Sequence, residues 1–465
     1  MDRAALEQLP KEALITLLLA QEARIAELER RLGLNSSNSG KPPSSDGLKK
    51  PPRVSSLRES SGKKTGGQKG HRGETLRRSE PPDATIDHYP EACTACGGVL
   101  NAAMATDYIA RQVFDIPAPC PLIVTEHRAR GCRCATCGSW TWAAFPGGVA
   151  APVQYGPTIA ALAAYLSAAH FVSEGRIVQL LKDVFKADVS AASVAAMVRR
   201  KAAELTGFAT AVGTAARNAT VKHADETGIR IGAALHWLQA LATTVLTFYV
   251  ATLNRGEIIV CTAGVVVHDH FKSYFSLEGV QHALCNQHHL RELKALAEIE
   301  KEPWAADMAR LLRVACHAAN LARRHDVAVR PRFLAVLTDR YRRIVAEALA
   351  FHADQVPLDP PGRKKRGRPK RRPGHNLAIR LRDYEEAALR FLHDPAVPFT
   401  NNLGELAMRM AKVKMKVSGC FRTMAGAQDF AVLRGAIDTA RKQGWCVFQA
   451  LKTPPEILIG RLRTG

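Results

Sequence analysis

Apolar and polar residues alternate along much of the segment 219–285, with the two-residue period that is typical of β-strands. Five runs in this segment are predicted strands, namely ATVKHA, GIRIGAALHW, TTVLTFYVATL, GVVVH and QHALC. RGEIIVCTA, at residues 255–263, is predicted to be a short helix. Residues 157–206 and 295–395 instead repeat their apolar positions with helical spacing. The pattern therefore predicts a multidomain α/β protein whose β-rich core is joined to helical segments.

Three carboxylates accompany these predicted elements. Asp225 and Asp269 each lie at the polar end of a strand-like run, and Glu405 lies in a helix-like segment 180 residues after Asp225. Mg²⁺ and Mn²⁺ prefer oxygen ligands and retain positions for water and phosphate, so these residue types suit a metal site for phosphodiester chemistry. The predicted elements occur in a defined order: a strand with Asp, a hairpin, a helix, a second strand with Asp and a late helix with Glu. This is the order of an RNase H-like fold.

Short motifs surround these carboxylates. They are DET at 225–227, D-x-x-x-Y with one extra residue from Asp269 to Tyr274, C-x-x-H-x-x-R from Cys285 to Arg291, TNN-x-x-E ending at Glu405, and the runs KVKMKVSGCFRT and TARKQG. With these motifs the sequence resembles the bacterial DDE transposases of the insertion sequence 66 family over nearly its whole length. The resemblance implies a DNA transposase with two Mg²⁺ or Mn²⁺ ions at Asp225, Asp269 and Glu405. Its substrates would be the element's terminal inverted repeats and target DNA, and element-encoded helper proteins are further candidate partners.

The sequence departs from this family beside the glutamate. The family usually reads N-x-A-E-R, whereas Gly404 and Leu406 flank Glu405 here. Glycine weakens a helix, and the missing arginine removes a candidate phosphate contact. A catalytically inactive, DNA-binding relic that represses its element is therefore one alternative to an active transposase. A structure-selective nuclease without strand transfer is another.

Composition narrows the class of protein. At 465 residues, 46% of them hydrophobic, the chain is long enough for about three or four modules that each bury a core. The net charge of +22 predicts a polyanionic partner such as DNA. No run of about 18 apolar residues occurs, and the N-terminus lacks the apolar core of a signal peptide, so we expect no membrane partner and a cytoplasmic, nucleoid-associated protein. The 11 cysteines suit reduced thiols and metal ligands better than a disulfide framework.

Residues 1–34 are predicted to form a coiled-coil helix. Leu14, Leu18, Gln21, Ile25, Leu28 and Leu32 follow alternating spacings of four and three, and all except Gln21 are apolar. Such a helix can pair protomers into a homo-oligomer, and the alternative is an amphipathic helix docked on its own chain. Residues 35–84 are predicted to be a disordered basic linker, with 11 Lys or Arg against 3 Asp or Glu over 41–78. This linker either contacts the phosphate backbone or is merely solvated.

Two cysteine pairs predict a small zinc-binding domain at residues 85–150. Cys93 and Cys96 form one C-x-x-C pair and Cys134 and Cys137 form the other, and a glycine follows each pair. Four thiolates in this arrangement close a tetrahedral structural zinc site. Cys132 can substitute for Cys134, which leaves that ligand open, and a redox role for the pairs is the less favoured alternative.

Residues 151–215 are predicted to be a helical, helix-turn-helix-like DNA-binding domain. Ser190 or Ser193 caps its last helix, which would bring Arg199, Arg200 and Lys201 near phosphates. Helical scaffolding without DNA contact is the alternative. Residues 216–292 are predicted to be the first part of the RNase H-like core.

The C-x-x-H-x-x-R motif lies at the end of this part. Cys285 and His288 have metal-like spacing, but a packed cysteine beside a histidine that faces the active site is favoured over a second zinc site. His288 and Arg291 are predicted auxiliary residues near the scissile phosphate.

Residues 293–397 are predicted to be a helical insertion that carries a basic loop at 360–376. Eight of the ten residues 363–372 are basic. Arg366 and Arg368 belong to an R-G-R-P unit that resembles an AT-hook, which predicts binding in an A·T minor groove. A non-specific phosphate clamp is the alternative.

Residues 398–465 are predicted to be the C-terminal part of the core, with the Glu405 helix and a tail. Asn402 is predicted to cap this helix, so that Glu405 and Arg409 lie one turn apart and the arginine holds the glutamate or a phosphate. The helix and its extension are predicted to bind the transposon end through Lys412, Lys414, Lys416 and Arg422.

Overall fold

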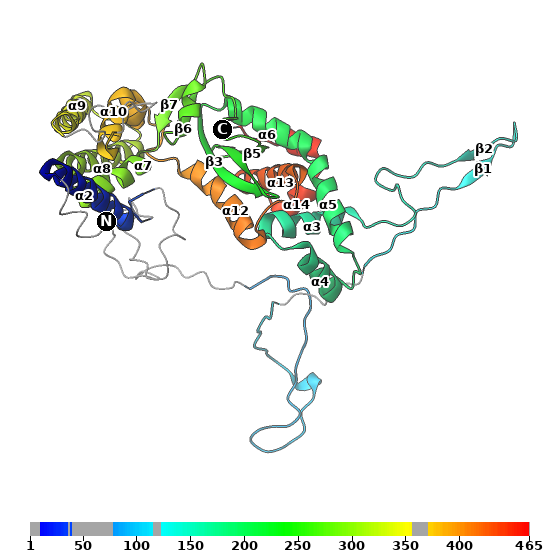
Figure 1. The fold of residues 1–465 in the computed structure, drawn as a ribbon. Helices are drawn as coiled ribbons and strands as arrows, with labels where there is room; N and C mark the ends of the chain where they lie inside the picture. The colour runs from blue at the N-terminus through cyan, green and yellow to red at the C-terminus, as the bar shows by residue number, and fades with distance from the viewer. Residues whose placement is uncertain (1–9, 36–37, 40–77, 115–121, 356–370, 465) are drawn as a thin grey trace.

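The computed structural model describes residues 10–35, 38–39, 78–114, 122–355 and 371–464. Its centre is a five-stranded mixed sheet with the strand order β5-β4-β3-β6-β7 (Figure 1). The strands are β3 Val221–Ile231, β4 Ala234–Ala242, β5 Thr247–Thr252, β6 Val265–His268 and β7 Gln281–Leu284. β3, β4 and β5 pair antiparallel, whereas β6 pairs parallel with β3 and β7 pairs parallel with β6. Three predicted strands, TTVLTFYVATL, GVVVH and QHALC, contain β5, β6 and β7. The other two have different bounds in the structure, because ATVKHA forms only the first part of β3 and GIRIGAALHW spans the end of β3, a turn and the start of β4.

Two expectations about this part of the chain are wrong. Residues 255–263 form no helix but an irregular, extended connection between β5 and β6. Its β-branched residues favour extended backbone, and Ile259 and Cys261 are buried while Val260 between them is 63% exposed. Asp225 is not at the end of a strand but is the fifth residue of the 11-residue strand β3. Because most of β3 is buried, the aspartate interrupts the apolar pattern without ending the strand.

Helices cover both faces of the sheet, because its strands carry apolar side chains on both sides. Ala224, Leu241 and Val266 face a core that includes α3 Pro157–His170, α6 Thr206–Asn218 and α13 Met424–Gln443. Val265 and Val267 point the other way, into a core with α7 Asn286–Glu298 and α8 Pro303–Arg324. Ile229 and Leu238 pack with α12 Asn402–Ser418, the helix that carries Glu405. The sheet is therefore the middle layer of the fold.

Helices occupy the described part of the segment predicted to be a helical insertion. Four helices follow α7, namely α8, α9 Pro331–Ala353, α10 Pro373–Asp383 and α11 Glu385–His393. Most of the predicted basic loop, including Arg366 and Arg368, lies outside the described residues.

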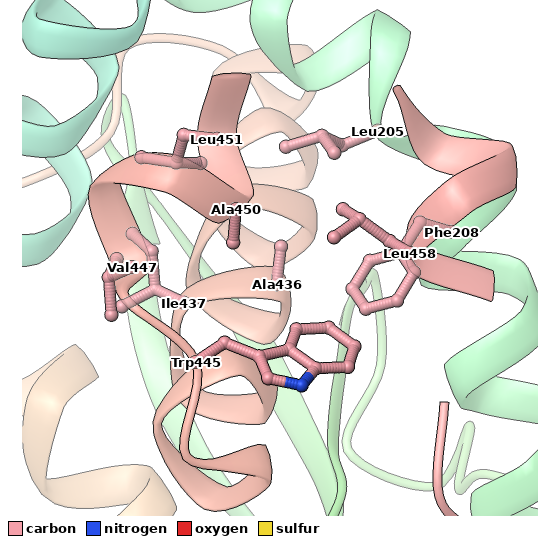
Figure 2. A pocket seen from close by; sticks show the side chains of 9 residues that line it. All are labelled: Leu205, Phe208, Ala436, Ile437, Trp445, Val447, Ala450, Leu451 and Leu458. Atoms are coloured by element: carbon pink, nitrogen blue, oxygen red, sulfur yellow. The ribbon is translucent and has the colours of Figure 1, made fainter. Parts of the chain in front are cut away.

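The C-terminal helices complete the layer that contains α13. α14 Val447–Lys452 and α15 Pro455–Gly460 pack with α13 around a void of about 10 Å³, which Leu205, Phe208 and Trp445 help to line (Figure 2). A space of this size is barely enough for one water molecule, and its lining is apolar. The void is thus a packing defect of the core and not a ligand site.

The predicted helix-turn-helix region contains α3, α4 Glu174–Phe185 and α5 Ala191–Glu204. Ser190 caps α5, because its side-chain oxygen accepts a hydrogen bond from the backbone nitrogen of Ser193 at 3.1 Å. Arg199 and Arg200 are exposed, as the expected phosphate contacts require. Lys201 is only 6% exposed and pairs with Glu204, so the expectation that Lys201 contacts phosphate is wrong. Lys201 follows Val194 and Met197 on the inward face of the helix.

The N-terminal region contains α2 Lys11–Gly33, so the predicted helix is present. Leu18, Ile25, Leu28 and Leu32 on this helix are exposed, and Arg30 near its end lies 3.9 Å from Glu300. Pairing of two such helices stays a prediction, and residues 40–77 of the predicted linker lie outside the described residues. Among the helices that the structure describes, none combines the length and hydropathy needed to cross a membrane.

Candidate active site

The strand register brings Asp225 and Asp269 together. β3 and β6 are parallel neighbours, with Val221 opposite Val265 and His223 opposite Val267. Asp225 and Asp269 each come two residues after the last of these pairs, so the two aspartates lie side by side where β6 ends and β3 continues. The structure thus brings two of the three predicted carboxylates to one place.

Glu405 reaches the same place from α12. The first turn of this helix lies against β3, since a Cβ atom added to Gly404 would be 3.1 Å from the Cβ atom of Asp225. Burial and the negative charges of Glu226, Asp269 and Glu405 raise the pKa of Asp225 to about 8. The carboxylates are therefore close enough to repel one another.

Asn401 fixes the start of α12, a role that the sequence assigned to Asn402. The helix begins at Asn402, and the buried side chain of Asn401 does not cap it. Instead, the Asn401 amide donates a hydrogen bond to the Ala224 carbonyl at 2.7 Å, and its oxygen lies 2.9 Å from Nδ1 of His223. Burial lowers the pKa of His223 to about 4, so the neutral ring donates to that oxygen. These bonds tie the Glu405 helix to the Asp225 strand.

Glu226 has a cation that Asp225 lacks. Oε1 of Glu226 lies 3.0 Å from Nε and 2.8 Å from Nη2 of Arg255, and Oε2 accepts a hydrogen bond from the Tyr274 hydroxyl at 2.5 Å. Among the described residues, no Lys, Arg or His nitrogen makes an ion pair with Asp225 or Asp269. Glu226 is thus neutralised within the protein, whereas the two aspartates remain available to an external cation.

The sequence interpretation missed this Glu226–Arg255 pair. In the sequence, Glu226 is the second residue of the DET motif and Tyr274 is the last residue of the D-x-x-x-Y motif. Arg255 lies in the segment that was wrongly predicted to be a helix. The Arg255 guanidinium also stacks on Phe271, with its central carbon 4.0 Å from the ring centroid. Only the tertiary structure brings Arg255 to Glu226, which is 29 residues away in sequence.

The auxiliary residues of α7 face Glu405. Oε1 of Glu405 lies 3.8 Å from Nδ1 of His288 and 3.9 Å from Nη2 of Arg291. Sγ of Cys285, the residue before α7, lies 3.7 Å from the same oxygen. His288 and Arg291 thus lie beside Glu405, and their contact with the scissile phosphate stays a prediction.

Of the two roles expected for Arg409, holding Glu405 is wrong, and contacting a phosphate stays a prediction. Glu405 is directed toward α7, and its ion pairs in the described part of the chain are those with His288 and Arg291. Arg409 is exposed on α12, together with Lys412 and Lys416 at helical spacings of three and four. Lys414 is half-buried, which lowers the pKa of its amine, and Arg422 is exposed beyond the helix. The helix thus presents an outward basic stripe of Arg409, Lys412 and Lys416.

A polar cavity of about 270 Å³ adjoins Asp269. Asp269, Cys285, His288 and Arg380 are among its lining residues. This volume holds several water molecules or a phosphate group. A substrate phosphate and metal ions can therefore reach Asp269 and the start of α7 through this cavity.

The two predicted zinc pairs adopt the same turn. Gly97 donates a backbone hydrogen bond to the Cys93 carbonyl, and Gly138 donates one to the Cys134 carbonyl, each at 2.9 Å. Backbone hydrogen bonds within the turns lower the pKa of the Cys93 thiol and lower that of Cys134 to about 7. Cys132 lies outside the turn, in the short strand β1 Gly131–Arg133, which pairs with β2 Trp140–Trp142.

The structure does not bring the two turns together. In the part of the chain that it describes, Cys93, Cys96, Cys134 and Cys137 do not gather within 4.8 Å of one another. Each turn presents thiolates in a form that zinc can bind, but the closed four-thiolate site stays a prediction.

Comparison with known protein families adds independent information. The model of a family described as "Transposase IS66 family" matches residues 152–429, which is more than half of the chain and includes Asp225, Asp269 and Glu405. A "Family of unknown function (DUF6444)" matches residues 3–77. No curated protein matches the chain.

Proposed function

Because the chain belongs to the IS66 family of transposases, we propose that it cleaves the ends of an insertion sequence and joins them to target DNA by phosphoryl transfer. The observation that carries this proposal is the convergence of Asp225, Asp269 and Glu405 from β3, the end of β6 and α12. The strand order, with the Asp225 strand in the middle and its parallel neighbour carrying Asp269, supports an RNase H-like catalytic core.

The donor set fits divalent magnesium or manganese. Asp225, Asp269 and Glu405 offer only oxygen atoms. Burial and the neighbouring carboxylates together raise the pKa of Asp225, and no cation of the described residues pairs with it. These three residues would hold the metal. When bound, a pair of such ions stabilises the attacking and leaving oxygens of a phosphodiester displacement.

Residues around the carboxylates would bind and orient the DNA. Arg291 lies within 3.9 Å of Glu405 and supplies positive charge for the scissile phosphate. The Glu226–Arg255 pair and Asn401 keep β3 and α12 in fixed positions, so that Asp225 and Glu405 need little reorganisation when substrate binds.

The remaining basic residues would bind DNA away from the reacting phosphate. The net charge of +22 and the basic stripe of α12 support contacts to the phosphate backbone, as do Arg422, Arg199 and Arg200. The basic loop with Arg366 and Arg368 would add a further contact. The exposed apolar residues of α2 support assembly of a homo-oligomer, and a zinc ion at Cys93, Cys96, Cys134 and Cys137 would stabilise residues 85–150.

The test uses the isosteric changes Asp225→Asn, Asp269→Asn and Glu405→Gln in the full chain. Each should abolish cleavage of the element's own ends with Mg²⁺ or Mn²⁺ and leave end binding nearly unchanged, because each removes a charge without removing volume. Glu298→Gln, at an exposed carboxylate of α7, is the matched control and should cleave normally.

The products separate this proposal from its alternatives. Cut and joined ends support a transposase, whereas cut ends without joined product support a structure-selective nuclease. End binding without cleavage in the wild type, with any divalent metal and with helper proteins supplied, supports an inactive relic and contradicts the catalytic assignment.

A further inference from the structure

Glu405 belongs to a second group of possible metal ligands. Among the described residues, Cys285, His288 and Glu405 bring a sulfur, a nitrogen and an oxygen atom within 4.8 Å of one another. The Cys285 sulfur lies 3.7 Å from Oε1 of Glu405, and Nδ1 of His288 lies 3.8 Å from the same oxygen. The three side chains come from the end of β7, from α7 and from α12, so the fold itself assembles this group.

These separations suit a tetrahedral zinc ion. Zinc binds sulfur at about 2.3 Å and nitrogen or oxygen at about 2.0 to 2.2 Å, which puts ligand atoms at tetrahedral angles roughly 3.4 to 3.6 Å apart. The observed distances are only a few tenths of an ångström longer. Magnesium instead requires octahedral oxygen ligands and disfavours sulfur. The mixed donor set therefore selects zinc-like ions against the metal that suits the three carboxylates.

His288 differs from the histidine beside it in a way that points to a ligand. His289 is buried, and its Nδ1 has a partner in the side chain of Asn286 at 3.0 Å. Nδ1 of His288 is also buried, but it has no hydrogen-bond partner in the described part of the chain. A buried nitrogen without a partner is costly unless something binds it. A metal ion between His288, Cys285 and Glu405 would satisfy it.

A metal ion has a route to this group. Cys285 is only 1% exposed, but Cys285 and His288 both line the 270 Å³ cavity next to Asp269. That cavity has room for a water molecule as the fourth ligand. The backbone nitrogen of Asn401 donates a hydrogen bond to the Cys285 sulfur at 3.1 Å, which orients this side chain.

We propose that Cys285, His288 and Glu405 form a zinc site and that zinc bound there inhibits DNA cleavage. Binding joins zinc to the sulfur, to Nδ1 of neutral His288 and to the carboxylate, and it releases the thiol proton to solvent. Oε1 of Glu405 is then held by zinc on the side of α7 and is no longer available as a ligand beside Asp225 and Asp269. The binding part concerns these side chains alone, and the inhibition part rests on the proposed function.

Cobalt reports the binding directly, because a thiolate bound to Co²⁺ gives a charge-transfer band. The full-length wild type should bind one more equivalent of thiolate-ligated Co²⁺ than Cys285→Ser. Cobalt bound at other cysteines contributes equally to both proteins, so it cancels when the two bands are subtracted. His288→Gln should weaken this equivalent at least tenfold, and it provides a second variant at a partly exposed position. Cys316→Ser is the control, since Cys316 is buried in the core of α8 and is not one of the clustered ligands. Equal bands in the wild type and Cys285→Ser would overturn the site.

Zinc titration against a fixed Mg²⁺ concentration tests the inhibition. Each protein's cleavage rate is compared with its own rate without zinc, so changes in basal activity do not enter. Half-inhibition should require at least tenfold more zinc for Cys285→Ser and His288→Gln than for the wild type and Cys316→Ser. Unchanged zinc sensitivity would overturn the inhibition. A cobalt band from Cys285 in a wild type that cuts no DNA would support the zinc site and contradict the proposed function instead.

Discussion

A Cβ atom on Gly404 would lie 3.1 Å from the Cβ atom of Asp225 and 2.9 Å from both Oδ1 and Nδ2 of Asn401. Two hydrogen bonds hold the Asn401 side chain, to the Ala224 carbonyl and to His223, so it cannot move aside without losing them. The sequence suggested that Gly404 merely weakens the helix. The structure gives the glycine a positive role, because it lets α12 approach the Asp225 strand.

Gly404→Ala should therefore lower both stability and cleavage. Overpacking a tight site costs about 1 to 3 kcal/mol, which outweighs the gain of about 1 kcal/mol from replacing glycine in a helix. We expect a lower urea midpoint and at least tenfold slower cleavage of element ends. Leu406→Arg is the control, since Leu406 is 41% exposed and its replacement should change stability by less than about 0.5 kcal/mol. A Gly404→Ala protein that is more stable and more active would indicate a decayed copy.

Much of the candidate site could be predicted from the sequence. Asp225 and Asp269 lie beside apolar runs, and adjacent parallel strands are the usual way to bring such residues together. The errors arose where tertiary contacts override local pattern. Lys201 is a charged residue of a type usually found at the surface, but it follows Val194 and Met197 on a buried helix face. Arg409 lies one helical turn after Glu405, but that glutamate is directed toward α7. The spacings of three and four residues from Val194 to Met197 and to Lys201 could have revealed the buried face, whereas the direction of Glu405 leaves no periodic signal in the sequence.

The zinc prediction can be tested at the ligand that the sequence left open. Cys134 begins a turn with the same backbone hydrogen bonds as the turn at Cys93, and these bonds lower the pKa of its thiol to about 7, whereas Cys132 lies in β1. Cys134→Ser should therefore lose the structural zinc, about one ion per chain, and Cys132→Ser should keep it. Metal analysis of protein purified without chelator checks both. Loss of zinc from Cys132→Ser alone would reverse the assignment.

The basic stripe of α12 predicts a change in the salt dependence of DNA binding. Lys412 and Lys416 are exposed on one face of the helix, so each can neutralise a phosphate. Replacing both with Gln should weaken end binding and reduce the log–log salt slope by about 0.9 for each lost contact. Binding isotherms at several salt concentrations measure the slope. Lys452→Gln, at an exposed position on α14, is the control, and an equal slope in all three proteins would show that the stripe does not contact DNA.

Glu302 and His352 form a buried pair at the base of the helical insertion. Oε2 of Glu302 accepts a hydrogen bond from Nε1 of Trp304 at 2.7 Å and lies 3.2 Å from Nε2 of His352. Burial raises the pKa of Glu302 to about 7 and lowers that of His352 to about 4. The folded protein thus favours the uncharged form of both side chains near neutral pH.

Replacing Glu302 with Gln should stabilise the protein increasingly as pH rises. Between pH 4.5, the ordinary pKa of Glu, and about pH 7, the folded wild type retains a proton that the unfolded chain releases. Its stability therefore falls through this window, by up to about 3 kcal/mol, and stays lower above it. Gln does not titrate, still accepts the hydrogen bond from Trp304, and leaves the His352 contribution common to both proteins. Urea unfolding at pH 5 and pH 8 measures the free energy of unfolding. Glu302→Gln should exceed the wild type in this free energy by more at pH 8 than at pH 5, whereas Glu298→Gln, at an exposed position, should equal the wild type at both pH values. An advantage that shrinks as pH rises would mean that Glu302 is buried as a stabilised carboxylate.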